Sequence, residues 1–92
     1  MKSPPFEFMS EEDLPPADRL LLVMHNLGIV NENRGQIITE LVNETTIPSV
    51  QLAEMLRKHE ESGYVSSITD HEGLRRYFLT GKGIIRVSST FT

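Results

Sequence analysis

The order of elements predicted between Ile47 and Gly83 constrains the fold of this chain more than any other feature. The pattern predicts a helix closed by a glycine and then a hairpin, with the helix over residues 47–62, Gly63 at its end, β-type runs over residues 64–69 and 74–79, and the turn Asp70-His71-Glu72-Gly73. Thr80 is a favourable N-cap for one more helix, although the glycines and β-branched residues after it lower helix propensity. We expect a short helix there, packed on the first helix of the chain. A helix followed by a hairpin and a further helix is the order of a recognition helix and its wing.

Two helices are predicted upstream of this unit. The first covers residues 17–27, where apolar side chains recur at the spacing of one buried stripe, and Gly28 suits the left-handed position that ends a helix. A connector, or a short edge strand around Val30, leads to a second helix over residues 34–43. Its inward-facing residues are expected to be Ile37, Ile38, Leu41 and Val42. A polar turn over residues 43–46 then gives the spacing of a helix-turn-helix.

These elements predict a mainly helical α+β fold, the winged helix-turn-helix, with a three-helix core, a β-hairpin wing and a short C-terminal helix. Residues 17–92 are expected to form the winged-helix domain, whereas residues 1–16, with four prolines and an acidic cluster, are typical of an N-terminal arm or tail. The helix over residues 47–62 is expected to bury Leu52, Leu56 and a hydrogen-bonded His59 on one face flanked by Ala53, with Met55 on another face.

Charge and composition narrow the function classes. The net charge is −4, but residues 1–47 hold three basic and eight acidic side chains, whereas residues 48–92 hold six basic and five acidic ones. The half with the helix and wing is therefore the less acidic one, which keeps contact with phosphates open. The longest apolar run, Leu20 to Met24, is too short to span a bilayer and no signal-peptide pattern opens the chain, so a cytoplasmic protein without membrane contact is expected.

A known family carries much of this pattern. The run Val50-Gln-Leu-Ala-Glu-Met-Leu-Arg-Lys-His-Glu-Glu-Ser-Gly-Tyr-Val65, followed by Leu79-Thr-Gly-Lys-Gly83, resembles winged-helix regulators of the MarR and PadR kind. Residues at matching positions are Leu56, Gly63, Tyr64, Val65, Leu79, Thr80 and Gly83, while His59 replaces a leucine. The resemblance covers residues 34–83. The sequence lacks the pattern of the long flanking helices found in full-length MarR proteins. The resemblance implies a sequence-specific DNA-binding transcriptional regulator that dimerises through its first helix and terminal segments.

The helix over residues 47–62 holds the first candidate DNA contacts. In a major groove its N-terminal turns would bring Ser49, Val50 and Gln51 near base edges, because glutamine can bond adenine through two hydrogen bonds. Arg57 and Lys58, farther along, could reach the phosphate backbone. Glu54 repels phosphate unless it accepts a hydrogen bond from a cytosine amino group. The alternative is an ordinary solvated helix face.

The hairpin holds the second set of candidates. Arg75 and Arg76 flank the wing, where arginines can enter a narrow minor groove, and His71 stands at its tip. Ser66 and Ser67 on the opposite strand carry small hydroxyls suited to phosphate, and Lys82 lies at a predicted helix start, a common place for a phosphate contact. The alternative is that both arginines pair with Asp70 and Glu72 on the same hairpin.

Enzymatic and metal-dependent functions find little support. The three histidines stand on different elements without metal-ligand spacing, cysteine is absent, and no set of nucleophile, base and orienting group can be assembled. No cofactor is expected. The alternative to DNA binding is a winged-helix module that binds protein, which the acidic net charge favours. A third hypothesis has Phe6, Phe8 and Leu14 bind a partner.

Overall fold

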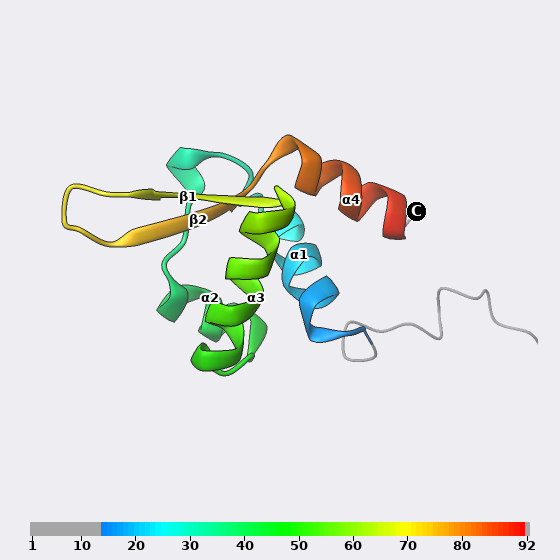
Figure 1. Cartoon of the computed structure of the whole chain (residues 1–92), viewed down its shortest axis with the longest axis horizontal. Coiled ribbons are helices and arrows are strands. Elements are labelled where there is room, and N and C mark those ends of the chain that lie inside the picture. The colour runs from blue at the N-terminus through cyan, green and yellow to red at the C-terminus, as the bar shows by residue number, and fades with distance from the viewer. Residues whose placement is uncertain (1–13, 92) are drawn as a thin grey trace, which may run out of the picture.

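A computed structural model describes residues 14–91 of the chain as four α-helices, one short 3₁₀ helix and a two-stranded hairpin (Figure 1). The elements in chain order are α1 (Pro16–Asn26), η3 (Glu32–Arg34), α2 (Ile38–Thr45), α3 (Ser49–Ser62), β1 (Val65–Thr69), β2 (Arg75–Leu79) and α4 (Gly81–Phe91). The predicted α+β, mainly helical fold is confirmed. The hairpin projects away from the helices, with α3 at its base and α1 and α4 on the opposite side of the molecule (Figure 1).

Helices α1 and α3 both end at a glycine with a positive φ angle, 73° at Gly28 and 83° at Gly63. In each case the following amide reaches back over five residues to a helix carbonyl: Ile29 N–H to Met24 O and Tyr64 N–H to His59 O, both at 2.9 Å. This geometry satisfies carbonyls that the helix leaves unpaired, and glycine adopts it without steric cost. The predicted ends of both helices are confirmed.

The segment after α1 is a connector, one of the two predicted alternatives, and its edge contact lies at Gln36 and not around Val30. Gln36 exchanges both of its backbone hydrogen bonds with Tyr77 of β2, each at 2.9 Å. Nearer the start of the segment, the Ile29 carbonyl accepts a hydrogen bond from Leu79 N–H at 2.8 Å. The chain between α1 and α2 therefore runs along the free edge of β2.

Helix α2 begins at Ile38, four residues later than predicted, and ends at Thr45 instead of residue 43. The Glu40 carboxylate accepts a hydrogen bond from Ile37 N–H at 3.1 Å, which satisfies one of the unpaired amides at the helix start. At the other end Thr46 has a φ angle of 59° and stops the helix. The turn of the helix-turn-helix is therefore residues 46–48.

Helix α3 begins one residue after Pro48, which occupies the N-cap, so the prediction placed the start two residues early. Its buried side chains are Leu52, Met55, Leu56 and His59. The predicted place of Met55 on another face is wrong, and Ala53, expected to flank the buried face, is exposed. The His59 Nε2 atom lies 3.1 Å from the Ala17 carbonyl oxygen of α1, which confirms the hydrogen-bonded core histidine.

The hairpin pairs antiparallel, with Val65 opposite Leu79 and Thr69 opposite Arg75. Tyr77 and Leu79 are buried against the helices, and the predicted turn at residues 70–73 joins the strands. The base of the wing is thereby part of the hydrophobic core.

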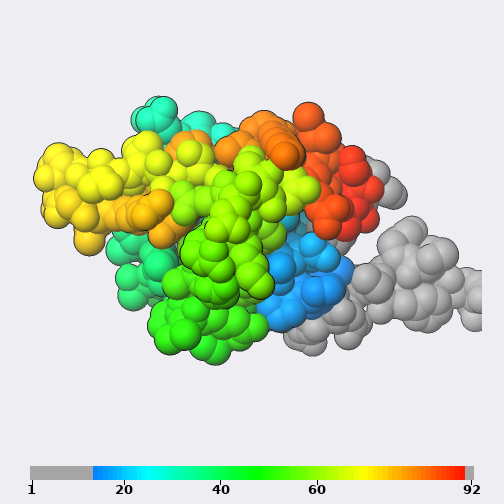
Figure 2. Space-filling view, in the orientation of Figure 1, coloured from blue at the N-terminus to red at the C-terminus, as the bar shows by residue number. Residues whose placement is uncertain are grey.

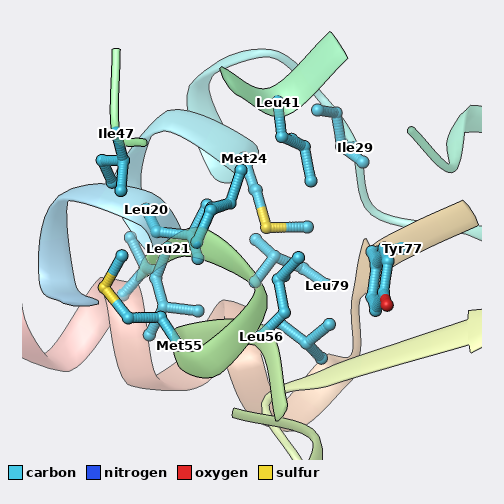
Figure 3. Packing of buried hydrophobic residues seen from close by; sticks show 13 residues of the cluster. Leu20, Leu21, Met24, Ile29, Leu41, Ile47, Met55, Leu56, Tyr77 and Leu79 are labelled. Atoms are coloured by element: carbon cyan, nitrogen blue, oxygen red, sulfur yellow. The ribbon is translucent and has the colours of Figure 1, made fainter. Parts of the chain in front are cut away.

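The core is built from side chains of all four α-helices and both strands (Figure 3). Leu20 and Met24 of α1, Leu41 of α2, Leu56 of α3 and Leu79 of β2 are fully buried there. Helix α4 packs against α1, as predicted.

Helix α4 starts where two hydrogen bonds of Thr80 fix the chain. The Thr80 Oγ1 atom accepts from Gly83 N–H at 3.0 Å, the N-cap bond that the sequence predicts, and donates to the Gly63 carbonyl at 2.6 Å. Of the helices described here, none is long and apolar enough to cross a membrane.

Candidate nucleic-acid interface

One face of α3 is uncovered along its length, and the wing projects beside it (Figure 2). The predicted contact residues Ser49, Val50 and Gln51 are all exposed at the N-terminal end of this helix. Val50, the apolar residue among the three, is 85% exposed. The structure therefore leaves the three expected base-reading side chains free to meet a partner.

Farther along the same face, Arg57 is held between two carboxylates of its own helix. Its guanidinium lies 2.6 Å from Glu54 Oε2 and 2.6 Å from Glu61 Oε2. The hydrogen bond and the charge of Arg57 lower the pKa of the Glu54 carboxyl below its ordinary value. These three residues, here called the α3 ladder, carry one positive and two negative charges on the exposed face.

Lys58 lies beside the ladder and is exposed. Within residues 14–91 it takes part in no salt bridge. Its ammonium group can therefore bond a phosphate without first breaking a salt bridge to a carboxylate. Of the two basic residues predicted on α3, Lys58 is thus the one available for backbone contact.

The two arginines of the wing point to opposite faces of the hairpin, as consecutive residues of a strand must. Arg75 reaches back to α3, where its Nη2 lies 3.1 Å from Glu60 Oε2, and its guanidinium stands 5.6 Å from the Tyr77 ring centroid. Its Nε donates to Ser67 Oγ at 2.9 Å. Arg75 therefore pairs with Glu60, and not with Asp70 or Glu72, the hairpin partners that the alternative expects.

Arg76 does pair within the hairpin, as the alternative expects. Its Nε lies 2.8 Å from Asp70 Oδ2, its Nη1 donates to the Gly35 carbonyl at 3.2 Å, and Glu40 of α2 is 3.7 Å away. The Asp70 carboxylate also accepts from the backbone amide of Leu74, and that bond, followed by the one from Arg76, lowers the pKa of Asp70.

The remaining predicted contacts are divided between the wing and the far end of α3. His71 is exposed at the wing tip and Ser66 is half-buried on β1, so both lie on the projecting hairpin. Lys82 does not: its Nζ donates to the Ser62 carbonyl at 2.8 Å and lies 5.4 Å from the Tyr64 ring centroid. It caps the C-terminal end of α3, the end remote from Ser49.

Glu60 is a residue of this surface that sequence reasoning missed, whereas Ser67 was expected to meet phosphate and bonds to Glu60 and Arg75 in the structure. Ser67 Oγ donates to Glu60 Oε2 at 2.8 Å, which joins the strand to the helix. The contact between Glu60 and Arg75 spans fifteen positions of the chain, so neither helical nor strand periodicity could reveal it.

Within residues 14–91, no group of three or more histidine, cysteine, aspartate or glutamate side chains could hold a metal ion. What the site offers is an exposed helix with amide, hydroxyl and apolar side chains, an ion-paired centre and an adjoining wing.

No protein-family model and no curated protein matches the sequence. Solved structures do match its fold. A candidate DNA-binding protein from Ralstonia eutropha is 20% identical with a TM-score of 0.72, and the match covers 86% of this chain and 98% of that one. MepR, a transcription regulator of the Staphylococcus aureus multidrug efflux pump MepA, is 14% identical with a TM-score of 0.70 over 91% of this chain.

This chain spans 57% of MepR, just over half of that protein's length. MepR has also been solved in complex with DNA, and that structure matches with a TM-score of 0.66 and 14% identity over 92% of this chain and 65% of that one. These likenesses confirm the predicted winged helix-turn-helix fold.

Proposed function

We propose that this protein is a sequence-specific DNA-binding transcriptional regulator. The observation that carries the proposal is the joint exposure of α3 and the projecting wing on a fold shared with MepR, a regulator solved in complex with DNA (Figures 1 and 2). In this proposal α3 enters a major groove, Ser49, Val50 and Gln51 meet base edges, and Lys58 contacts a phosphate.

The wing then lies along the flanking groove. His71 and Ser66 are its candidate contacts, and Arg75 and Arg76 can join them only by leaving, or sharing, the carboxylates that hold them. Arg57 is in the same position within the α3 ladder. Because most cations of this surface are neutralised, we expect affinity to depend modestly on salt, with sequence selectivity carried by the N-terminal turns of α3.

We further propose that the protein acts in the cytoplasm as a homodimer, with α1 and the terminal segments between the subunits. A dimer presents two recognition helices to two half-sites, which is the common arrangement of helix-turn-helix proteins. Of the arm predicted over residues 1–16, Leu14 is buried in the domain and Pro16 begins α1, so residues 1–13 remain as candidates for an arm. Light scattering on the full chain and on a variant lacking residues 1–13 measures whether the arm serves self-association.

The second candidate is a winged-helix module that binds protein. The formal net charge of −4 and the excess of one negative charge in the α3 ladder favour it, because DNA binders generally carry a basic surface.

Fluorescence anisotropy on duplex DNA at several salt concentrations separates the two. The regulator should bind its native upstream region more tightly than scrambled DNA, and Lys58→Ala should weaken both by a similar factor, about threefold to tenfold. Gln51→Ala should instead reduce the preference for the native region. Absence of binding at low salt contradicts the DNA-binding function and leaves the protein-binding module.

A further inference from the structure

A three-residue contact fastens the wing to the last turn of α3. Glu60 of α3, Ser67 of β1 and Arg75 of β2 bond to one another: Ser67 Oγ donates to Glu60 at 2.8 Å, Arg75 Nε donates to Ser67 at 2.9 Å, and Arg75 Nη2 donates to both Glu60 oxygens at 3.1 and 3.2 Å. The Glu60 side chain is 26% exposed, about half the exposure of the Glu54 side chain in the α3 ladder. The contact joins α3, β1 and β2 through one residue of each, and we call it the wing brace.

The opposite face of the hairpin is fastened independently. Arg76 bonds to the Gly35 carbonyl and to Asp70, and Gly35 lies so near that a Cβ on it would stand 2.9 Å from Arg76 Cβ. Because Arg75 bonds to α3 and Arg76 bonds to the Gly35 carbonyl, tilting the hairpin would stretch charge-assisted hydrogen bonds on one face or the other.

We propose that Glu60 is a positioning residue for DNA binding: through the wing brace it fixes the angle between the recognition helix and the wing, so that both fit one duplex together. This inference rests on the DNA-binding function proposed above. Its physical basis is preorganisation, because a wing already held at the binding angle loses less conformational freedom when the duplex binds.

Loss of the wing brace and loss of the Glu60 charge predict opposite changes in DNA affinity when Glu60 is replaced. Glu60 places a negative charge beside the proposed DNA surface, so charge alone predicts tighter binding when it is removed. Loss of the brace predicts weaker binding. Glu61 supplies a matched control, since it is the next residue of the same helix, has the same charge, and bonds to Arg57 of α3 and not to the wing.

The experiment compares the affinity of the full chain for two duplexes. One contains the binding site alone, and the other adds flanking base pairs that the wing can reach. We expect Glu60→Ala to weaken binding to the longer duplex about fivefold and to leave the shorter duplex within about twofold. Glu61→Ala should tighten binding to both duplexes by a similar small factor. A general loss of folding would weaken both duplexes alike, so dependence on the flank is the readout that identifies positioning.

Two more variants separate loss of the wing brace from loss of the Glu60 charge. Ser67→Ala removes one arm of the brace without changing net charge and should weaken binding to the longer duplex in the same direction. Glu60→Gln keeps an acceptor for Ser67 and should recover part of the lost affinity.

The outcomes are distinct. Glu60→Ala behaving like Glu61→Ala overturns the positioning role while the DNA-binding function stands. A wild-type chain that binds neither duplex overturns the DNA-binding function and the positioning role with it.

Discussion

At Gly83 the backbone of α4 passes against the chain that enters the wing. A Cβ atom at this position would stand 2.1 Å from the Tyr64 carbonyl oxygen and 3.0 Å from Leu79 Cδ2. The first of these is a backbone atom in a segment held by hydrogen bonds on both sides, so it cannot move aside cheaply. A glycine at the end of the motif Leu79-Thr-Gly-Lys-Gly83 is therefore a steric requirement of this fold.

The substitution Gly83→Ala should destabilise the protein by about 3 kcal/mol, because α4 must shift away from Tyr64 to make room. Gly81→Ala is the matched control, since a Cβ there meets nothing within 4 Å and alanine favours a helix. Urea denaturation followed by circular dichroism measures both. Equal stability of the two variants would show that α4 does not approach Tyr64 this closely.

His59 is the second residue whose setting has a measurable consequence. Burial lowers its pKa below the ordinary value, and the Arg86 cation lowers it too, which outweighs the opposite effects of the Ala17 carbonyl and the Asp18 carboxylate. The folded protein thus binds a proton at His59 less readily than the unfolded chain does.

We expect the free energy of unfolding to fall as the pH drops from about 7 toward 5, because in that interval the unfolded chain takes up a proton that the folded state resists. Above that interval His59 is neutral in both states and contributes no pH dependence. Thermal melts of wild type and His59→Gln across this range test the prediction. The variant should lose much of the slope, whereas His71→Gln, at the exposed wing tip, should keep it.

At the scale of an element, the wing is held at its far end by one aspartate. Asp70 Oδ1 accepts from Glu72 N–H at 2.8 Å and Leu74 N–H at 2.9 Å, and Asp70 Oδ2 accepts from Arg76. A single carboxylate therefore shapes the turn and ties it to the strand that follows.

Asp70→Ala should speed hydrogen exchange of the hairpin amides several-fold while leaving the core helices protected, because local opening no longer has to break these bonds. Glu72→Ala, in the same turn, is the control, since within residues 14–91 Glu72 forms no salt bridge. If both variants exchange alike, the turn does not depend on the Asp70 carboxylate.

The elements differ in how well local sequence could predict them. The ends of α1 and α3 were predictable because Gly28 and Gly63 act through local backbone geometry. The start of α2 was not, since the chain before it is held by bonds to Tyr77 and Leu79 more than forty residues away. Distant bonds of this kind leave no periodic signal in the segment itself.

The candidate site follows the same division. Exposure of Ser49, Val50 and Gln51 followed from their place on the predicted helix, and the hairpin followed from two β-type runs around the turn at residues 70–73. The partners of Arg75 and Lys82 did not, because Glu60 and the Ser62 carbonyl come to them only through the fold. Met55 was misplaced for another reason: it lies three residues after Leu52, on the same helical stripe as Leu56 and His59, so the helical repeat itself predicts its burial.

At the scale of the whole molecule, one core joins the three-helix unit, the hairpin and α4. Leu56 of α3 is fully buried within it, beside residues from α1 and β2 (Figure 3). No part of residues 14–91 has a separate cluster of buried apolar side chains. We therefore expect helices and wing to unfold in one cooperative transition.

Leu56→Ala should cost about 3 kcal/mol of stability, from the lost apolar burial and the cavity that remains. The loss should be the same whether unfolding is followed by helical circular dichroism or by the fluorescence of Tyr64, just before β1, and Tyr77 of β2. Leu74→Ala, whose side chain is 42% exposed on the wing, should change stability by no more than about 0.5 kcal/mol. Non-coincident transitions would reveal a wing that unfolds separately.

The base and the tip of the hairpin differ in how far their sequence and length can change. Its base is locked into the core, where Leu79 bonds to Ile29 and Gly83 lies against Tyr64. Its tip, at residues 70–73, touches none of these groups, so a matched pair of residues added there, one to each strand, would lengthen the reach of the hairpin by about 3.4 Å. The alternation that buries Tyr77 would stay intact. The fold thus separates a fixed anchor from an extensible arm, so the reach of the hairpin can be altered without rebuilding the interior of the protein.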